Sequence, residues 1–178
     1  MEHVGKKITD IIARYSIIVF LSVQNFWIFY FIFTPLTIYP VYFILQTFVD
    51  AVLIKNIIVI NTQYPIEIID ACIAGSAYYI LAILNLSTLG IGIKTRIKMV
   101  LFAFGSLLIF NILRISVLSF IFLNSMPVFI AAHKFFWYFM STAFVVAIWF
   151  FEVKLFKIKE IPIYSDLKFL HKHSMKGK

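Results

Sequence analysis

The sequence predicts an all-α fold, a polytopic integral membrane helical bundle of about five transmembrane helices, in a single domain over residues 1–178. Hydrophobic residues make up 62% of the chain, and charged residues make up only 13%. An ordinary soluble domain has roughly 25% charged residues. A water-soluble globule could not hide so much apolar surface from water. The composition also excludes a disordered chain and a disulfide scaffold.

Five apolar runs are long enough to cross the bilayer core as helices, which takes about 20 residues each. They cover residues 15–33, 36–54, 71–91, 99–123 and 128–151. The breaks between them contain residues that favour turns, such as Pro35, Gly90, Gly92 and Pro127. These breaks predict where one crossing ends and the next begins.

Residues 56–69 are not typical of a membrane helix. The segment is rich in β-branched residues and contains Asn61, Thr62, Pro65 and Glu67. This pattern predicts a short strand-turn-strand or an interfacial loop. We expect the segment to form a strand-like loop on the extracytoplasmic side.

The basic residues predict the orientation, because cytoplasmic loops collect Lys and Arg. The chain has 16 basic and 8 acidic residues. A basic tail over 152–178 and the loop between the third and fourth runs, with Lys94, Arg96 and Lys98, share one side and are expected to be cytoplasmic. Five crossings would put the N-terminus outside, against the basic Lys6 and Lys7; a first segment lying in the interface would resolve this conflict. The expected location is the plasma membrane.

Three reactive side chains are expected at one depth near the outer surface. Arg114 comes 16 residues after Lys98, which is roughly 24 Å along a helix that crosses a core of about 30 Å. His133 comes six residues after Pro127, roughly 9 Å below the outer end of its run. Cys72 lies at the outer start of the third run. An ionisable residue inside a span is a functional candidate by default.

Each of these residues also has a simpler interpretation. Cys72 could be a small apolar filler, Arg114 could reach the headgroups, and His133 could be an interfacial polar residue. Asn111, one helical turn before Arg114, could hydrogen-bond a neighbouring helix. Three independent explanations are less economical than one shared site, so we favour the shared site.

The chemistry available to this set is nucleophilic. Cys72 could attack as a thiolate, favoured by a helix N-terminus and a nearby positive charge. His133 could take the thiol proton and return it to a leaving amine, and Arg114 could stabilise an oxyanion. A single Cys excludes an intramolecular disulfide. We expect no metal site and no cofactor.

The residues that carry this chemistry resemble the exosortase/archaeosortase family, and the small archaeal branch most of all. The resemblance lies in the run from Asp70 through Cys72 to Gly75, in Asn111 and Arg114 on the next run, and in His133, within an expected core of 34–151. It implies that Cys72 is the nucleophile, Arg114 the essential arginine, Asn111 its companion and His133 the third catalytic position, with Asp70 and Gly75 in support. The family pattern has Gly two residues after the Cys, where this chain has Ala74.

The resemblance also implies an activity and a set of partners. Members process secreted proteins that end in a short recognition motif, a transmembrane helix and a basic cluster. The enzyme cuts near the motif at the outer face and passes the new carboxyl end to an acceptor, as a sortase-like cysteine protease or transpeptidase. The expected partners are such secreted proteins and membrane lipids, and not nucleic acid.

Two other functions remain open from the residues. A small transporter or channel subunit could use Asp50, Arg114 and His133 as a polar path across the bilayer. Against it, Arg114 and His133 cluster near one surface, and no ionisable residue is expected in the inner half of the last three runs. A non-catalytic assembly factor could dock anionic lipid or a partner through the basic tail.

Overall fold

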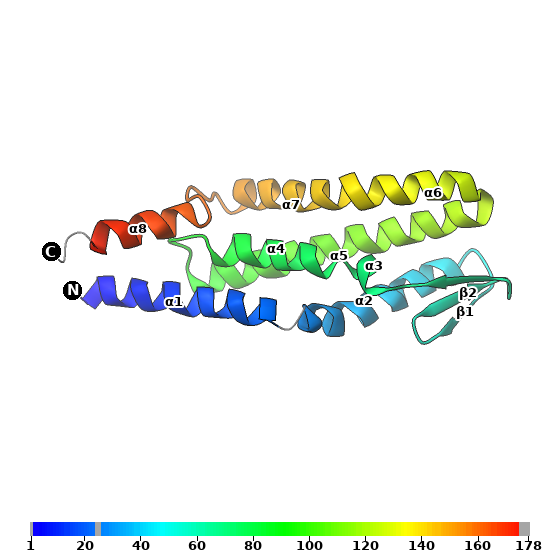
Figure 1. Cartoon of the computed structure of the whole chain (residues 1–178), viewed down its shortest axis with the longest axis horizontal. Helices are drawn as coiled ribbons and strands as arrows, with labels where there is room; N and C mark the ends of the chain where they lie inside the picture. The colour runs from blue at the N-terminus through cyan, green and yellow to red at the C-terminus, as the bar shows by residue number, and fades with distance from the viewer. Residues whose placement is uncertain (1, 24–25, 175–178) are drawn as a thin grey trace.

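A computed structural model describes residues 2–23 and 26–174, which are mostly helical (Figure 1). The helices are α1 (Glu2–Val23), α2 (Trp27–Gln46), α3 (Asp70–Ile73), α4 (Gly75–Leu86), α5 (Ile93–Asn124), α6 (Met126–Phe135), α7 (Ser141–Leu155) and α8 (Tyr164–Ser174). A π-helical segment, η1 (Phe136–Met140), joins α6 to α7. The strands β1 (Ala51–Ile54), β2 (Ile57–Ile60) and β3 (Tyr64–Glu67) form one antiparallel sheet in the order β1-β2-β3.

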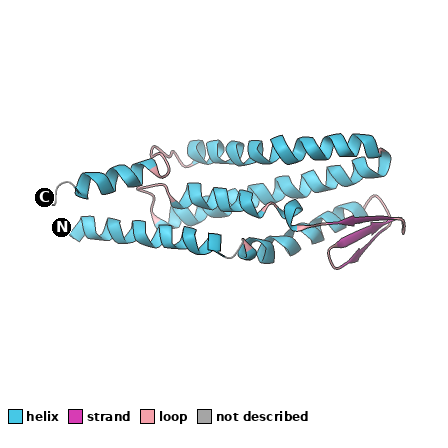
Figure 2. Ribbon diagram, viewed as in Figure 1, coloured by secondary structure: helices cyan, strands magenta, loops and turns pink. Residues whose placement is uncertain are grey.

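The helices lie roughly along one long axis (Figure 1), and α5 covers much of that length. The chain returns beside α5 through α6, η1 and α7. The sheet lies at one end of the molecule, and both chain ends lie at the other (Figure 2). Within the described ranges, α2 and α5 are the two helices long and apolar enough to cross a membrane; the bent pair of α6 and α7 adds a third if it counts as one span.

An aromatic cluster packs α2, α4 and α5 together. The ring of Tyr78, which is fully buried, stacks on Phe33 with centroids 3.7 Å apart. Phe104 meets the same ring edge-on at 5.5 Å. Offset stacks and edge-on contacts of this kind add stability beyond the buried area. The cluster therefore fixes α2 and α4 against the middle of α5.

The expected boundaries of the first two apolar runs are wrong. The helix α1 ends at Val23, and α2 begins at Trp27 after Phe26, which has a left-handed φ of 61°. The expected break at Pro35 lies inside α2, which also contains Pro40. An apolar helix tolerates proline where neighbouring helices and local adjustments satisfy the freed backbone groups. The sequence does contain a polar pair before α2, Gln24 and Asn25, but the prediction counted both within one apolar run over 15–33.

The sheet is larger than the expected strand-like loop over 56–69. That segment does contain β2 and β3, but its partner β1 lies in residues that were expected to end the second span. All four residues of Ala51–Ile54 are apolar. A run this short and uniform fits a strand and a helix equally well, so the hydrophobic pattern could not show that it forms a strand. Asp50 consequently lies in an exposed turn before β1, not inside a span.

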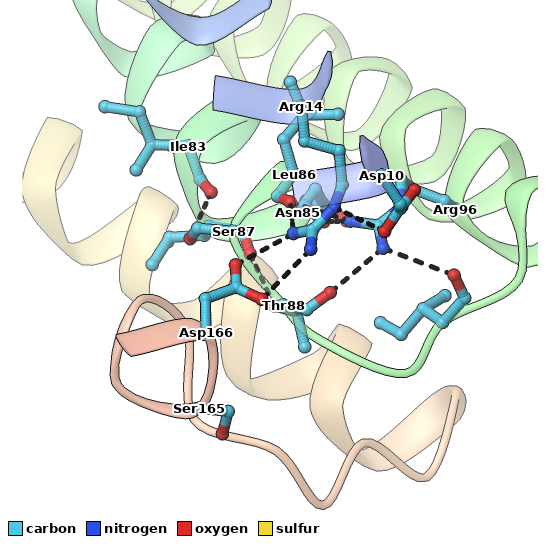
Figure 3. A network of polar contacts seen from close by, with 12 residues as sticks. Asp10, Arg14, Ile83, Asn85, Leu86, Ser87, Thr88, Arg96, Ser165 and Asp166 are labelled. Carbon is cyan, nitrogen blue, oxygen red and sulfur yellow. Dashed lines mark hydrogen bonds and ion pairs between the residues drawn. The ribbon is translucent and has the colours of Figure 1, made fainter. Parts of the chain in front are cut away.

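The end of the molecule opposite the sheet is held by a polar network (Figure 3). Arg14 of α1 donates to both carboxylate oxygens of Asp166 on α8, at 2.9 and 3.0 Å. Arg96 of α5 donates to four carbonyls at the end of α4 and in the turn that follows it, among them those of Asn85 and Thr88 at 2.8 and 3.0 Å. Arg14 and Asp166 are both buried, so the expected basic tail is partly a docked helix.

Candidate active site

A cavity of about 230 Å3 lies between the sheet and α3 on one side and α5, α6 and η1 on the other. The structure brings Cys72, Arg114 and His133 to its wall from three different elements. Most of the remaining wall is apolar, and it includes Phe122 and Phe129. The depths that the sequence implied for the three residues therefore correspond to one shared space.

Two side chains of α5 hold the backbone carbonyl of Cys72. The Nδ2 atom of Asn111 donates to this oxygen at 2.8 Å, and Nη2 of Arg114 donates to it at 3.0 Å. Asn111 is 3% exposed, so its amide needs this partner. Because the two residues are one turn apart on the same helix face, both can donate to the same carbonyl oxygen. The position of Cys72 is thus set by α5 as well as by its own helix.

The other side of the Arg114 guanidinium is held by a residue that sequence reasoning missed. Nη1 donates to the hydroxyl oxygen of Ser141 at 3.0 Å. That hydroxyl donates to the carbonyl of Phe136 at 3.1 Å, five residues earlier across the π-helical turn. A π-turn inside an α-helix often marks a functional site. A serine in an apolar run carries no such signal by itself, because its role depends on the π-turn.

The backbone around Cys72 is more broken than expected. Cys72 is half-buried in the single turn of α3, and its N–H donates to the carbonyl of Ile69 at 2.8 Å. The longer helix α4 begins only at Gly75, after Ala74 with a left-handed φ of 61°. The expected single helix start at Cys72 is therefore split in two. Any effect of a long helix on the thiol would have to come from α4.

The two small residues at positions 74 and 75, after Cys72, are each explained by a different feature of the structure. The left-handed region that Ala74 occupies is the one that glycine adopts without strain. At Gly75, an added Cβ would lie 2.8 Å from ring atoms of Tyr30 on α2. With the Tyr30 ring in this position, there is no room for a side chain at residue 75. The small-residue pattern after the Cys thus reflects both a turn and a tight helix contact.

His133 is half-buried in α6, where two aromatic rings flank it. Its imidazole centroid lies 5.5 Å from that of Phe129 and 5.9 Å from that of Trp137. All three side chains line the cavity. The imidazole therefore lies between two aromatic rings in the cavity wall.

The structure does not bring every candidate residue to this cavity. Asp70 is exposed at the start of α3, and Asp50 is exposed beyond the end of α2; neither lines the wall. Glu67 at the end of β3 does line it, although sequence reasoning had treated this residue as part of a loop. The cavity therefore contains a carboxylate that was not predicted.

Two buried ionisable residues, Glu152 and Arg96, lie just beyond the ends of the apolar runs, in which none was expected on the inner side. Glu152 was assigned to the tail, but it belongs to α7 and is fully buried. Its Oε2 accepts from Nδ2 of Asn85 on α4 at 3.1 Å. Arg96 is also buried, close to the start of α5. A tail boundary drawn from charge alone could not show that α7 continues past Phe151.

Comparisons of the chain with protein-family models, with curated proteins and with solved structures found no match. The case for a function therefore depends on the residues around the cavity and on their geometry.

Proposed function

We propose that this protein is a membrane-embedded, sortase-like cysteine protease or transpeptidase of the exosortase/archaeosortase type. It cleaves the C-terminal sorting signals of secreted proteins and transfers the new carboxyl end to an acceptor at the cell surface or in the lipid. One observation carries the proposal: the only Cys of the chain lines the same cavity as Arg114 and His133. The hydrogen bonds from Asn111 and Arg114 to the Cys72 carbonyl further support the proposal.

The proposed chemistry proceeds through a thioester. The Cys72 thiolate attacks the scissile carbonyl, and His133 passes the thiol proton to the leaving amine. The positive charge of Arg114 favours the thiolate and the oxyanion that follows. An acceptor then attacks the thioester and releases Cys72. The apolar wall keeps bulk water away from this step.

The proposed topology has four crossings of the plasma membrane instead of five. The segments are α2, the α3–α4 pair, α5, and the α6–η1–α7 pair, with the cavity toward the extracytoplasmic face. This arrangement is supported by the chain ends, which lie at the same end of the molecule (Figure 1). It puts Lys6 and Lys7 on the cytoplasmic side with the basic residues of α8, as the positive-inside rule requires. Lysines on α8 would then meet acidic lipid headgroups.

Loss of processing in a Cys72→Ala variant tests this function. The C-terminal peptides of secreted proteins would be compared by mass spectrometry in source cells that carry the wild type or the variant. We expect uncleaved signals to accumulate with Cys72→Ala. Ser76→Ala is the matched control, because Ser76 is exposed nearby and lies outside the cavity wall. Normal processing with Cys72→Ala would refute the proposal.

Transport is the second candidate, and the buried Glu152 is the observation that favours it. Asp50 no longer contributes, because it lies in an exposed turn. A polar path would instead run from Arg114 and His133 to Glu152, past the apolar middle of the bundle. Ion flux in proteoliposomes that Glu152→Gln abolishes, with no effect of Cys72→Ala, would favour this function over proteolysis.

A further inference from the structure

Among the residues that the structure describes, no strand pairs with one side of β3. It is the last strand in the order β1-β2-β3. The N–H of Ile68 donates to the carbonyl of Asn56 at 2.9 Å, which fixes the hydrogen-bonding phase of the β2–β3 pair. In an antiparallel pair, alternate residues point their backbone groups toward the partner strand. The backbone groups of Ile66 therefore face β2, and those of Pro65 and Glu67 face away from it.

This outer side of β3 borders the cavity that contains Cys72. Four consecutive residues, 65–68, line the cavity wall. The face of a strand would present only every second residue, so consecutive residues indicate that the strand edge borders the space. Pro65 is consistent with this direction, because proline lacks an N–H and is tolerated where that group would point away from the sheet. The edge offers one donor, the Glu67 N–H, and two acceptors, the carbonyls of Pro65 and Glu67.

We propose that an extended segment of the secreted substrate pairs with β3 as a fourth strand of the sheet and so brings its scissile bond to Cys72. This inference rests on the proposed function and specifies how its substrate is held. Strand addition recognises the main chain of any extended peptide, while pockets beside the strand select alternate side chains.

The opposite wall indicates which side chains such a peptide would present. Leu118 and Phe122 of α5 and Phe129 of α6 face the space across from β3. A paired peptide directs every second side chain to one side, where these residues would accept apolar groups. The Glu67 carboxylate, which accepts from Nδ2 of Asn56 at 3.3 Å, lies at the edge itself. The preferred partner is therefore an extended, mainly apolar peptide, recognised chiefly through its backbone.

Two substitutions at Glu67 distinguish the contribution of its backbone N–H to peptide binding from that of its side chain. Glu67→Pro and Glu67→Ala both remove the carboxylate and its contact with Asn56. Only Glu67→Pro also removes the N–H, and it does so on the side that does not pair with β2. The β2–β3 pairing is thus retained in both variants, and circular dichroism with thermal unfolding would check that they fold alike.

The probe is a pool of eight-residue peptides with randomised side chains and one diazirine, together with a matched pool in which the backbone amides are N-methylated. The wild type, Cys72→Ala, Glu67→Ala and Glu67→Pro would each be reconstituted in lipid nanodiscs and photo-cross-linked. Mass spectrometry would map the adducts within residues 64–72. N-methylation removes the donors that strand pairing needs.

We expect cross-linking to fall by about tenfold with the N-methylated pool and with Glu67→Pro, since one or two hydrogen bonds are lost. Glu67→Ala should retain most of it. Equal cross-linking of the two pools, or equal loss in Glu67→Pro and Glu67→Ala, would overturn the strand-pairing proposal. The Cys72→Ala variant keeps the two proposals apart. If the catalytic proposal alone fails, this variant cross-links normally and still processes its substrate.

Discussion

The side-chain amide of Asn111 donates a hydrogen bond of 2.8 Å to the backbone carbonyl of Cys72. Arg114, one turn further along α5, donates to the same oxygen at 3.0 Å. Both hydrogen bonds are made to the peptide that carries the candidate nucleophile, and neither is made to its thiol. We infer that α5 positions Cys72 through its main chain, which leaves the sulfur free to face the cavity.

Arg114→Lys should abolish most activity although it retains the positive charge. Arg114 reaches two partners at once, the Cys72 carbonyl and the Ser141 hydroxyl, both at 3.0 Å. A lysine ammonium has no planar fork and cannot keep this geometry. We expect kcat/KM for substrate cleavage to fall by about 100-fold, and Ser141→Ala to have a smaller effect in the same direction. Thr142→Ala, at an exposed neighbouring position, is the control. Wild-type activity of Arg114→Lys would contradict the proposal that Arg114 must donate to two partners at once.

Two substitutions of His133 can distinguish a role in proton transfer from a purely electrostatic role. His133→Ala should reduce the rate of cleavage by 10²–10⁴-fold, roughly the contribution of a positioned acid or base. His133→Arg places a permanent cation beside the aromatic rings but cannot exchange a proton near neutral pH. If the role is proton transfer, both variants are inactive in a cleavage assay. Activity of His133→Arg alone would show that the third position acts electrostatically.

The two small residues after Cys72 should respond in opposite directions to a change in size. Ala74→Gly relieves a left-handed φ of 61°, so we expect the free energy of unfolding to rise by about 1 kcal/mol. Gly75→Ala brings a methyl group to 2.8 Å from the Tyr30 ring, and we expect a loss of about 1–3 kcal/mol. Chemical unfolding in detergent measures both. Gly75→Ala as stable as wild type would mean that Tyr30 moves freely.

Buried and exposed acidic partners of Arg14 should differ sharply in importance. Asp166 is 1% exposed, whereas the side chain of Asp10 is 56% exposed. Asp166→Asn removes the buried counter-charge of Arg14 and leaves only the exposed Asp10, which costs up to about 3–5 kcal/mol. Asp10→Asn loses an exposed pair, which contributes no more than about 1 kcal/mol. Hydrogen exchange of α8 should therefore accelerate strongly in Asp166→Asn only, and equal protection in the two variants would be evidence against the docked tail.

Hydrophobicity and depth predicted some features of this molecule well. The run over 99–123 corresponds to α5, and the depth of Arg114 on that run anticipated its approach to Cys72. The grouping of Cys72, Arg114 and His133 could be foreseen because helical rise converts residue spacing into height. Their catalytic roles are a prediction, supported by this geometry.

Other features depend on tertiary contacts that no local pattern encodes. Pro35 lies inside α2, and the chain instead breaks before Trp27, where the polar pair Gln24 and Asn25 was counted within one apolar run. The strand β1 is recognisable only through its pairing with β2. Ser141 acquires its bond to Arg114 from the π-turn before it. Glu152 counts as a tail residue until its contact with Asn85 is seen.

Alkylation of the single cysteine tests the central claim most directly. Cys72 is the only thiol in the chain, so iodoacetamide can modify no other cysteine, and the modified fraction can be measured by mass spectrometry. If Cys72 is the nucleophile, the rate of substrate processing by the protein in lipid nanodiscs falls in direct proportion to the unmodified fraction. Full activity after complete alkylation of Cys72 would contradict the account.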